Sequence, residues 1–139
     1  MIVIYHNPDC GTSRNVLRVI EAAGYQPTVI EYLEKGWSKP QLLGLFAAAD
    51  ITPHTALRKT KSPADELGLL TAEVNEEEIF TAMLKYPILV NRPIVCTPRG
   101  VKLCRPSETV LEILDQWPSE AFEKEDGELI LNAKGKRVK

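Results

Sequence analysis

The first thirty-two residues constrain the fold more than any other part of the sequence. An apolar run over 2–5 predicts a short buried strand, and the β-branched residues of 28–32 predict a second one. Between them, apolar side chains recur at helical spacing from Val16 to Ala23, and Gly24 is a typical helix stop. A strand, a helix and a strand in this order form a βαβ unit, so we expect parallel pairing and a right-handed crossover.

Helix-capping residues punctuate the middle of the chain. Ser38 and Asn75 each stand three residues before a Gln or Glu and ahead of apolar residues at helical spacing. This pattern predicts two capped helices, and Pro87 ends the second. Shorter turns or helices are expected to open at 52–53 and 62–63, so this stretch forms a helical block.

The last third of the chain predicts strands again. The apolar segments 93–96 and 101–104 are joined by a Thr-Pro-Arg-Gly turn, which is typical of an antiparallel hairpin. Apolar residues at helical spacing predict a helix over 107–117. The charged segment 122–139 forms either an accessory hairpin or a loosely held tail.

The order of these elements indicates an α/β fold of the thioredoxin type, in which helices pack on a sheet made of two parallel strands and a hairpin. The length suits a single core, and no linker divides the chain. We therefore predict one domain over 1–139, with a helical insertion at about 38–86.

Composition excludes several classes of protein. The formal charge of −2 gives no overall attraction to nucleic acid or to an anionic membrane, and the apolar stretches are far shorter than the roughly 20 residues that span a bilayer. Cys10, Cys96 and Cys104 have no zinc spacing, and an odd number argues against a secreted disulfide scaffold. No secretory signal is visible. We expect a cytoplasmic protein with free thiols, with Cys96 in a strand core and Cys104 near a strand end.

Cys10 follows the first strand and stands where the helix is expected to start, with Thr12 or Ser13 as the cap. Backbone N–H groups and the helix dipole there favour a thiolate. Lowering a thiol pKa from about 8.5 to about 6.5 needs roughly 2.7 kcal/mol. A helix N-terminus supplies only about 0.3–1 kcal/mol, or ~2 kcal/mol in a buried geometry. Nearby cations are therefore needed, and Arg14 and His6 are local candidates.

The residues after Cys10 exclude two other thiol chemistries. A dithiol oxidoreductase has a second cysteine three positions on, where this chain has Ser13. A low-molecular-weight phosphatase has an arginine six positions on, where this chain has Val16. Cys10 is therefore expected to act as a monothiol that needs an external thiol or a distant cysteine, and the alternative is a buried structural cysteine.

Three arginines stand in settings that suit an oxyanion. Arg92 and Arg105 each precede a proline, which favours extended or turn backbone at strand ends, where α/β sites form. Arg58 lies in the helical block. A guanidinium donates paired hydrogen bonds and stays charged, so the three could clamp a tetrahedral oxyanion beside a thiolate. Taken singly, each could equally be a surface charge.

Several motifs together resemble the glutaredoxin-coupled arsenate reductases, the ArsC family. They are Tyr5-His6-Asn7-Pro8-x-Cys10-Gly11-Thr12-Ser13-Arg14-Asn15, Pro87-Ile88-Leu89-x-Asn91-Arg92-Pro93-Ile94-Val95, Leu103-Cys104-Arg105-Pro106-Ser107 and, near the end, Glu125-Asp126-Gly127-Glu128 and Gly135-Lys136-Arg137. The resemblance implies a thioredoxin/glutaredoxin-like fold with a helical insertion, and a cis-proline at Pro93.

The resemblance also implies an activity. Cys10 would be the nucleophile, supported by His6, and arsenate would be converted to arsenite. Glutathione would be the co-substrate and glutaredoxin the protein partner, with no bound cofactor or metal. The residues that would bind the oxyanion are Arg58, Arg92, Arg105, Gly11, Thr12 and Ser13.

Two other functions remain open from the sequence. A monothiol glutathione-dependent oxidoreductase acting on disulfides would need Cys10 but not the three arginines. A non-catalytic transcription regulator of the Spx type shares the scaffold, but typically carries a Cys-x-x-Cys pair, which Ser13 denies here.

Overall fold

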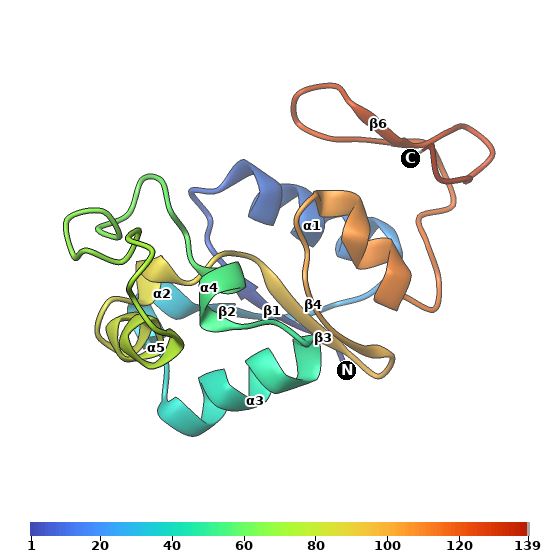
Figure 1. Ribbon diagram of the computed structural model, residues 1–139. Helices are drawn as coiled ribbons and strands as arrows, with labels where there is room; N and C mark the ends of the chain where they lie inside the picture. Colours follow the sequence, from blue (N-terminus) through green and yellow to red (C-terminus); the bar gives the residue numbers. More distant parts are fainter. Residues whose placement is uncertain (139) are drawn as a thin grey trace. The chain divides into compact units, whose positions relative to one another are not determined.

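The computed structural model describes residues 1–138, which separate into two compact units (Figure 1). Unit 1 contains Met1–Glu31 and the chain from Arg92 onward, and unit 2 contains Tyr32–Asn91. Among the helices of residues 1–138, none is long and apolar enough to cross a membrane.

Unit 1 is built on a four-stranded sheet of order β2-β1-β3-β4. β1 (Val3–His6) pairs in parallel with β2 (Thr28–Glu31) and antiparallel with β3 (Ile94–Thr97). β3 in turn pairs antiparallel with β4 (Gly100–Leu103). The predicted βαβ unit, the hairpin and the α/β thioredoxin-like fold are confirmed.

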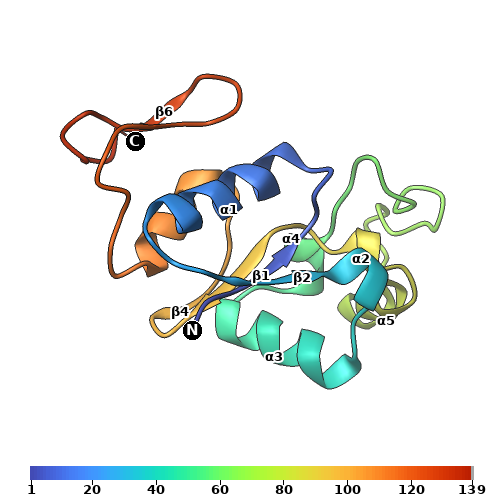
Figure 2. The same ribbon diagram turned by 180° about the vertical axis from the view of Figure 1, so that it is seen from behind.

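Two helices lie side by side on one face of this sheet, α1 (Gly11–Ala22) and the 3₁₀ helix η2 (Ser107–Ile113) (Figures 1 and 2). Both pack into one apolar core with the sheet. Fully burying an aliphatic side chain contributes about 1.5–3 kcal/mol, so this core fixes the start of α1 against β1 and β3. The fully buried members contributed by these four elements are Ile4, Val16, Val19, Ile20, Val95 and Val110.

The helix predicted over 107–117 is present as a 3₁₀ helix and is shorter than expected. Val110 and Ile113 are both buried, as are Leu111 and Leu114, so the core residues recur at a spacing of three. That spacing suits the three residues per turn of a 3₁₀ helix. The helix ends at Ile113, because Leu114 takes extended backbone.

The segment after η2 forms the accessory hairpin, the first of the two predicted alternatives. β5 (Phe122–Glu123) pairs antiparallel with β6 (Leu129–Leu131). Phe122, Ile130 and Leu131 join the core of unit 1, so the hairpin is anchored by buried apolar surface.

Unit 2 is helical. Its helices are α2 (Tyr32–Lys35), α3 (Lys39–Ala49), α4 (Pro53–Ala56), α5 (Glu76–Lys85) and the 3₁₀ helix η1 (Pro87–Leu89). Capping boxes at Ser38 and Asn75 are confirmed. Phe46 and Phe80 pack edge to face, with ring centroids 6.1 Å apart, and join α3 to α5.

One detail of unit 2 differs from the prediction. Tyr32, expected to end a strand, begins α2, where its ring stacks on Trp37 at 5.0 Å between centroids. The chain after Ser62 forms successive turns, the first of the two predicted alternatives, and Leu67 and Leu69 hydrogen-bond back to residues 63 and 64.

Candidate active site

Cys10 occupies the N-cap position of α1. β1 ends at His6, and a turn follows in which the N–H of Cys10 donates to the carbonyl oxygen of Asn7 at 3.1 Å. Cys10 has extended backbone, and its carbonyl oxygen accepts from the N–H of Arg14 at 2.9 Å. The helix therefore starts at Gly11, and the predicted caps were wrong, since the Cys10 side chain takes the place at which a capping hydroxyl would stand.

Two guanidinium groups reach the Cys10 thiol. Nη1 of Arg105 lies 3.7 Å from Sγ of Cys10, and also donates to the carbonyl oxygen of Arg92 at 3.1 Å. Arg92 acts on the same thiol through its charge and a hydrogen bond. The peptide bonds to Pro93 and Pro106 are both cis, as predicted for Pro93.

The Cys10 thiol is 6% exposed, yet its pKa lies below the ordinary value. Burial alone would raise the pKa, because it disfavours the charged form. The backbone N–H of Ser13 and the guanidinium groups of Arg92 and Arg105 outweigh burial. The cations that the helix start required are therefore supplied by residues more than eighty positions away in the sequence.

The other two cysteines show what burial does without such donors. Cys104, directly after β4, is completely buried, and burial raises its pKa to about 12. Cys96 lies in β3 but is only half-buried, because it alternates with the core-facing Val95. Burial raises its pKa as well. Cys10 is thus the one cysteine of the three that favours the thiolate.

His6 is linked to Cys10 through Ser13. Nδ1 of His6 and Oγ of Ser13 are 2.6 Å apart, and the same Oγ accepts from the N–H of Asn7 at 3.1 Å. Burial lowers the pKa of His6, outweighing the opposite effect of Glu31. A neutral imidazole cannot be the predicted cation, but it holds Ser13, whose backbone N–H bonds the thiol.

Arg14, the other local candidate, pairs with Glu125. Glu125 belongs to residues 124–128, which follow β5 and which we call the C-terminal segment. Nε and Nη2 of Arg14 donate to the two carboxylate oxygens of Glu125 at 2.8 and 2.9 Å, and its Nη1 donates to the carbonyl oxygen of Pro8. The N–H of Glu125 donates to Oδ1 of Asn15 at 3.0 Å. The sequence did not predict that this segment lies against the first turn of α1, although residues 125–128 belong to the motifs that resemble the family.

Arg58 belongs to unit 2. Its side chain is 9% exposed, and its Nε donates to the carbonyl oxygen of Thr60 at 3.1 Å. Its N–H donates to the carbonyl oxygen of Leu89 at 2.8 Å, beside the bridge between Leu57 and Val90. Its part in an oxyanion clamp stays a prediction.

A polar pocket of about 280 Å³ adjoins Cys10 within unit 1, and we call it the α1 pocket. Three segments form it: the start of α1, the loop after β4, and the chain after β5. The lining residues are Gly11, Thr12, Asn15, Pro106, Ser107, Lys124, Glu125 and Asp126.

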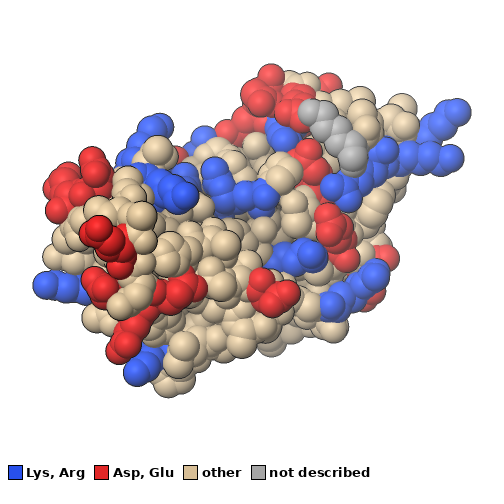
Figure 3. All heavy atoms as spheres, in the orientation of Figure 1, with Lys and Arg blue, Asp and Glu red and all other residues tan. Residues whose placement is uncertain are grey.

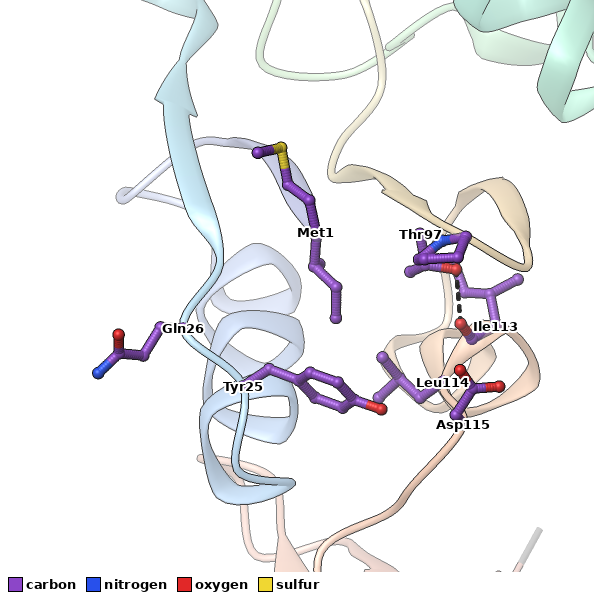
Figure 4. A pocket seen from close by; sticks show the side chains of 9 residues that line it. Met1, Tyr25, Gln26, Thr97, Ile113, Leu114 and Asp115 are labelled. Atoms are coloured by element: carbon purple, nitrogen blue, oxygen red, sulfur yellow. Dashed lines mark hydrogen bonds between the residues drawn. The ribbon is translucent and has the colours of Figure 1, made fainter.

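Two further cavities are lined by residues other than the predicted site residues. One of about 140 Å³ lies at the opposite end of the unit 1 sheet, where Tyr25 points toward Leu114 and Thr97 donates to the carbonyl oxygen of Ile113 (Figure 4). A larger, mainly apolar one of about 530 Å³ lies between α3 and α5 in unit 2. On the face in Figure 3, basic and acidic side chains are interspersed.

Comparisons with known proteins show the family of this chain. The ArsC family profile matches residues 5–113. This chain belongs to the ArsC family. It is 72% identical over 138 residues to the arsenate reductase ArsI2 of Synechocystis sp., covering 99% of each chain. It is 51% identical to an arsenate reductase of Escherichia coli, covering 99% of this chain and 98% of the relative.

Solved structures support the fold of this ArsC protein. An arsenate reductase from Vibrio cholerae superimposes with a TM-score of 0.75 at 37% identity, covering 81% of this chain and 97% of that one. A protein described as a putative arsenate reductase from Yersinia pestis gives the same TM-score at 33% identity.

Proposed function

We propose that this ArsC protein is an arsenate reductase in which Cys10 is the nucleophile. One observation carries the proposal: a buried thiol whose pKa is lowered by two guanidinium groups and a backbone N–H. Donors that stabilise a thiolate can equally bind the oxygens of a tetrahedral oxyanion. The full-length similarity to arsenate reductases supports arsenate as that oxyanion.

In the first step, Arg92 and Arg105 bind arsenate oxygens and offset the repulsion between thiolate and oxyanion. Sγ of Cys10 attacks arsenic, so that a sulfur–arsenic bond forms. One arsenate oxygen takes up protons and leaves as water. Arsenic remains at the +5 level in this adduct.

The second step transfers two electrons. The thiolate of glutathione attacks Sγ of Cys10, which forms a disulfide bond and breaks the sulfur–arsenic bond. The electron pair of that bond stays on arsenic, which leaves as arsenite at the +3 level. Glutaredoxin then reduces the Cys10–glutathione disulfide by thiol exchange. We place the reaction in the cytoplasm, where thiols are kept reduced.

The proposal is tested by measuring arsenite release from arsenate with glutathione and glutaredoxin. Cys10→Ser should reduce the rate to the uncatalysed background, since a serine hydroxyl at neutral pH is not ionised. The control is Cys96→Ser, which changes the half-buried thiol of β3 and should keep the wild-type rate. Full activity of Cys10→Ser would refute the proposal.

Substitutions of the arginines distinguish the proposed arsenate reductase from a monothiol oxidoreductase that acts on disulfides. Such an enzyme needs the Cys10 thiolate but no oxyanion site, so Arg92→Ala and Arg105→Ala would affect it only through the thiol pKa. For an arsenate reductase the same variants should also raise the KM for arsenate about tenfold or more. Unaltered arsenate kinetics in both variants would remove the arginine site.

A further inference from the structure

The α1 pocket is lined by residues that stand next to Cys10 and Arg105 in the sequence, although Cys10 and Arg105 themselves do not line it. Gly11 and Thr12 directly follow Cys10, and Pro106 and Ser107 directly follow Arg105, whose Nη1 contacts Sγ. The volume of about 280 Å³ is many times the roughly 30 Å³ share of one water molecule. The pocket therefore has room for a molecule larger than a tetrahedral oxyanion.

The charges of the pocket disfavour a simple anion. Glu125 and Asp126 place two carboxylates on its wall. Lys124 supplies an ammonium group, whose Nζ lies 3.0 Å from Glu108 and 3.6 Å from Glu128. Arsenate, with no cationic group, would be repelled by the carboxylates, whereas a ligand with both an ammonium and a carboxylate group finds a partner for each.

We propose that the α1 pocket binds glutathione by its charged end groups and so presents the thiol to the Cys10–arsenic adduct. This inference rests on the proposed function, in which a thiol attacks Sγ of Cys10. Glutathione carries an ammonium and a carboxylate at one end, a carboxylate at the other, and its thiol between them. With the γ-glutamyl end against Asp126 and Lys124, the thiol would lie on the side of Gly11 and Thr12, the residues that follow Cys10.

The C-terminal segment thereby becomes part of the thiol site. It is held by the paired hydrogen bonds between Arg14 and Glu125 and by the bond from Glu125 N–H to Asn15. It lies outside residues 5–113, which the ArsC profile matches. The segment therefore adds a determinant of thiol binding to Cys10 and the two arginines.

Binding is measured by NMR with S-methylglutathione, which cannot react, added to the isotope-labelled Cys10→Ser protein without arsenate. We expect the amide signals of Thr12, Ser107 and Asp126 to shift. Asp126→Asn keeps the oxygen that accepts from the N–H of Glu128 but removes the charge, and should weaken binding about five- to tenfold. Glu123→Gln, the same change at an exposed position of β5 outside the pocket, should leave the affinity at the wild-type value.

An analogue without the α-amino group sharpens the test. The protein that retains Asp126 should bind this analogue about five- to tenfold more weakly than it binds S-methylglutathione. The substitution Asp126→Asn should not weaken binding of the analogue further. In turnover, Asp126→Asn should raise the KM for glutathione more than the KM for arsenate.

The proposed glutathione site is refuted if S-methylglutathione shifts no amide signal of Thr12, Ser107 or Asp126. It is also refuted if the Asp126→Asn and Glu123→Gln variants bind S-methylglutathione equally well. That result would leave the arsenate reductase activity standing. An absence of arsenite release from the wild-type protein would instead overturn the proposed function, because the binding measurement contains no arsenate.

Discussion

At the residue scale, the cysteine side chain occurs in three environments with two opposite effects on its pKa. Cys104 and Cys96 are made less acidic by burial, while Cys10 is made more acidic by Ser13 and two arginines. The sequence predicted that Cys10 needs cations, because a helix start alone is too weak. It could not predict which ones, since Arg14 is near in sequence but pairs with Glu125.

The lowered pKa of Cys10 predicts how its alkylation depends on pH. The rate of reaction with iodoacetamide follows the thiolate fraction, so for the wild type it should rise to a plateau with a midpoint below the ordinary 8.5. Arg105→Ala removes a donor that stabilises the thiolate, so the midpoint should move upward by roughly 0.5–1 pH unit.

The control for this titration is Arg99→Ala, because Arg99 pairs with Asp115 and lies on the turn between β3 and β4. It should keep the wild-type midpoint. Equal midpoints for wild type and Arg105→Ala would show that this arginine does not stabilise the thiolate.

At the element scale, local patterns predicted most of the secondary structure. The capping boxes of α3 and α5 use residues three positions apart, so they are visible in the sequence. The failures came from longer-range effects. η2 is a 3₁₀ helix whose buried residues recur at a spacing of three and face one core. α1 starts at Gly11, earlier than predicted, because the turn after β1 places Cys10 at the N-cap.

The docking of the C-terminal segment on α1 predicts a difference between two substitutions of the buried Asn15. Asn15→Ala leaves the N–H of Glu125 without its acceptor, and should lower the free energy of unfolding by about 1–2 kcal/mol. Asn15→Asp keeps a side-chain oxygen there and should lose less than half as much. Urea denaturation measures both, and equal losses would show that the hydrogen bond contributes little.

At the scale of the whole molecule, the core of unit 1 joins both ends of the described chain. Ile4 of β1, Val95 of β3 and Leu131 of β6 belong to one cluster. Periodicity identified each of these segments but not their association, which depends on the pairing of Ile4 with Val95 and on the packing of β6 against them. The single domain over 1–139 and the role of Arg58 in unit 2 stay predictions.

The place of β6 in this core predicts that the hairpin is as costly to disturb as a central strand. Ile130→Ala should lower the free energy of unfolding by about 2–4 kcal/mol, because Ile130 is 1% exposed. Val138→Ala should change it by less than about 0.5 kcal/mol, since Val138 is 48% exposed. Similar small effects for both would show that the hairpin is only loosely held.

The central claim is that Cys10 reacts with arsenate and then with glutathione. Mass spectrometry of the wild-type protein incubated with arsenate and glutathione, without glutaredoxin, tests it most directly. We predict glutathione attached to Cys10 in proportion to the arsenite released, and none when phosphate replaces arsenate, since thiols do not reduce phosphate. Arsenite released with Cys10 unmodified, or equal modification with phosphate, would contradict the account.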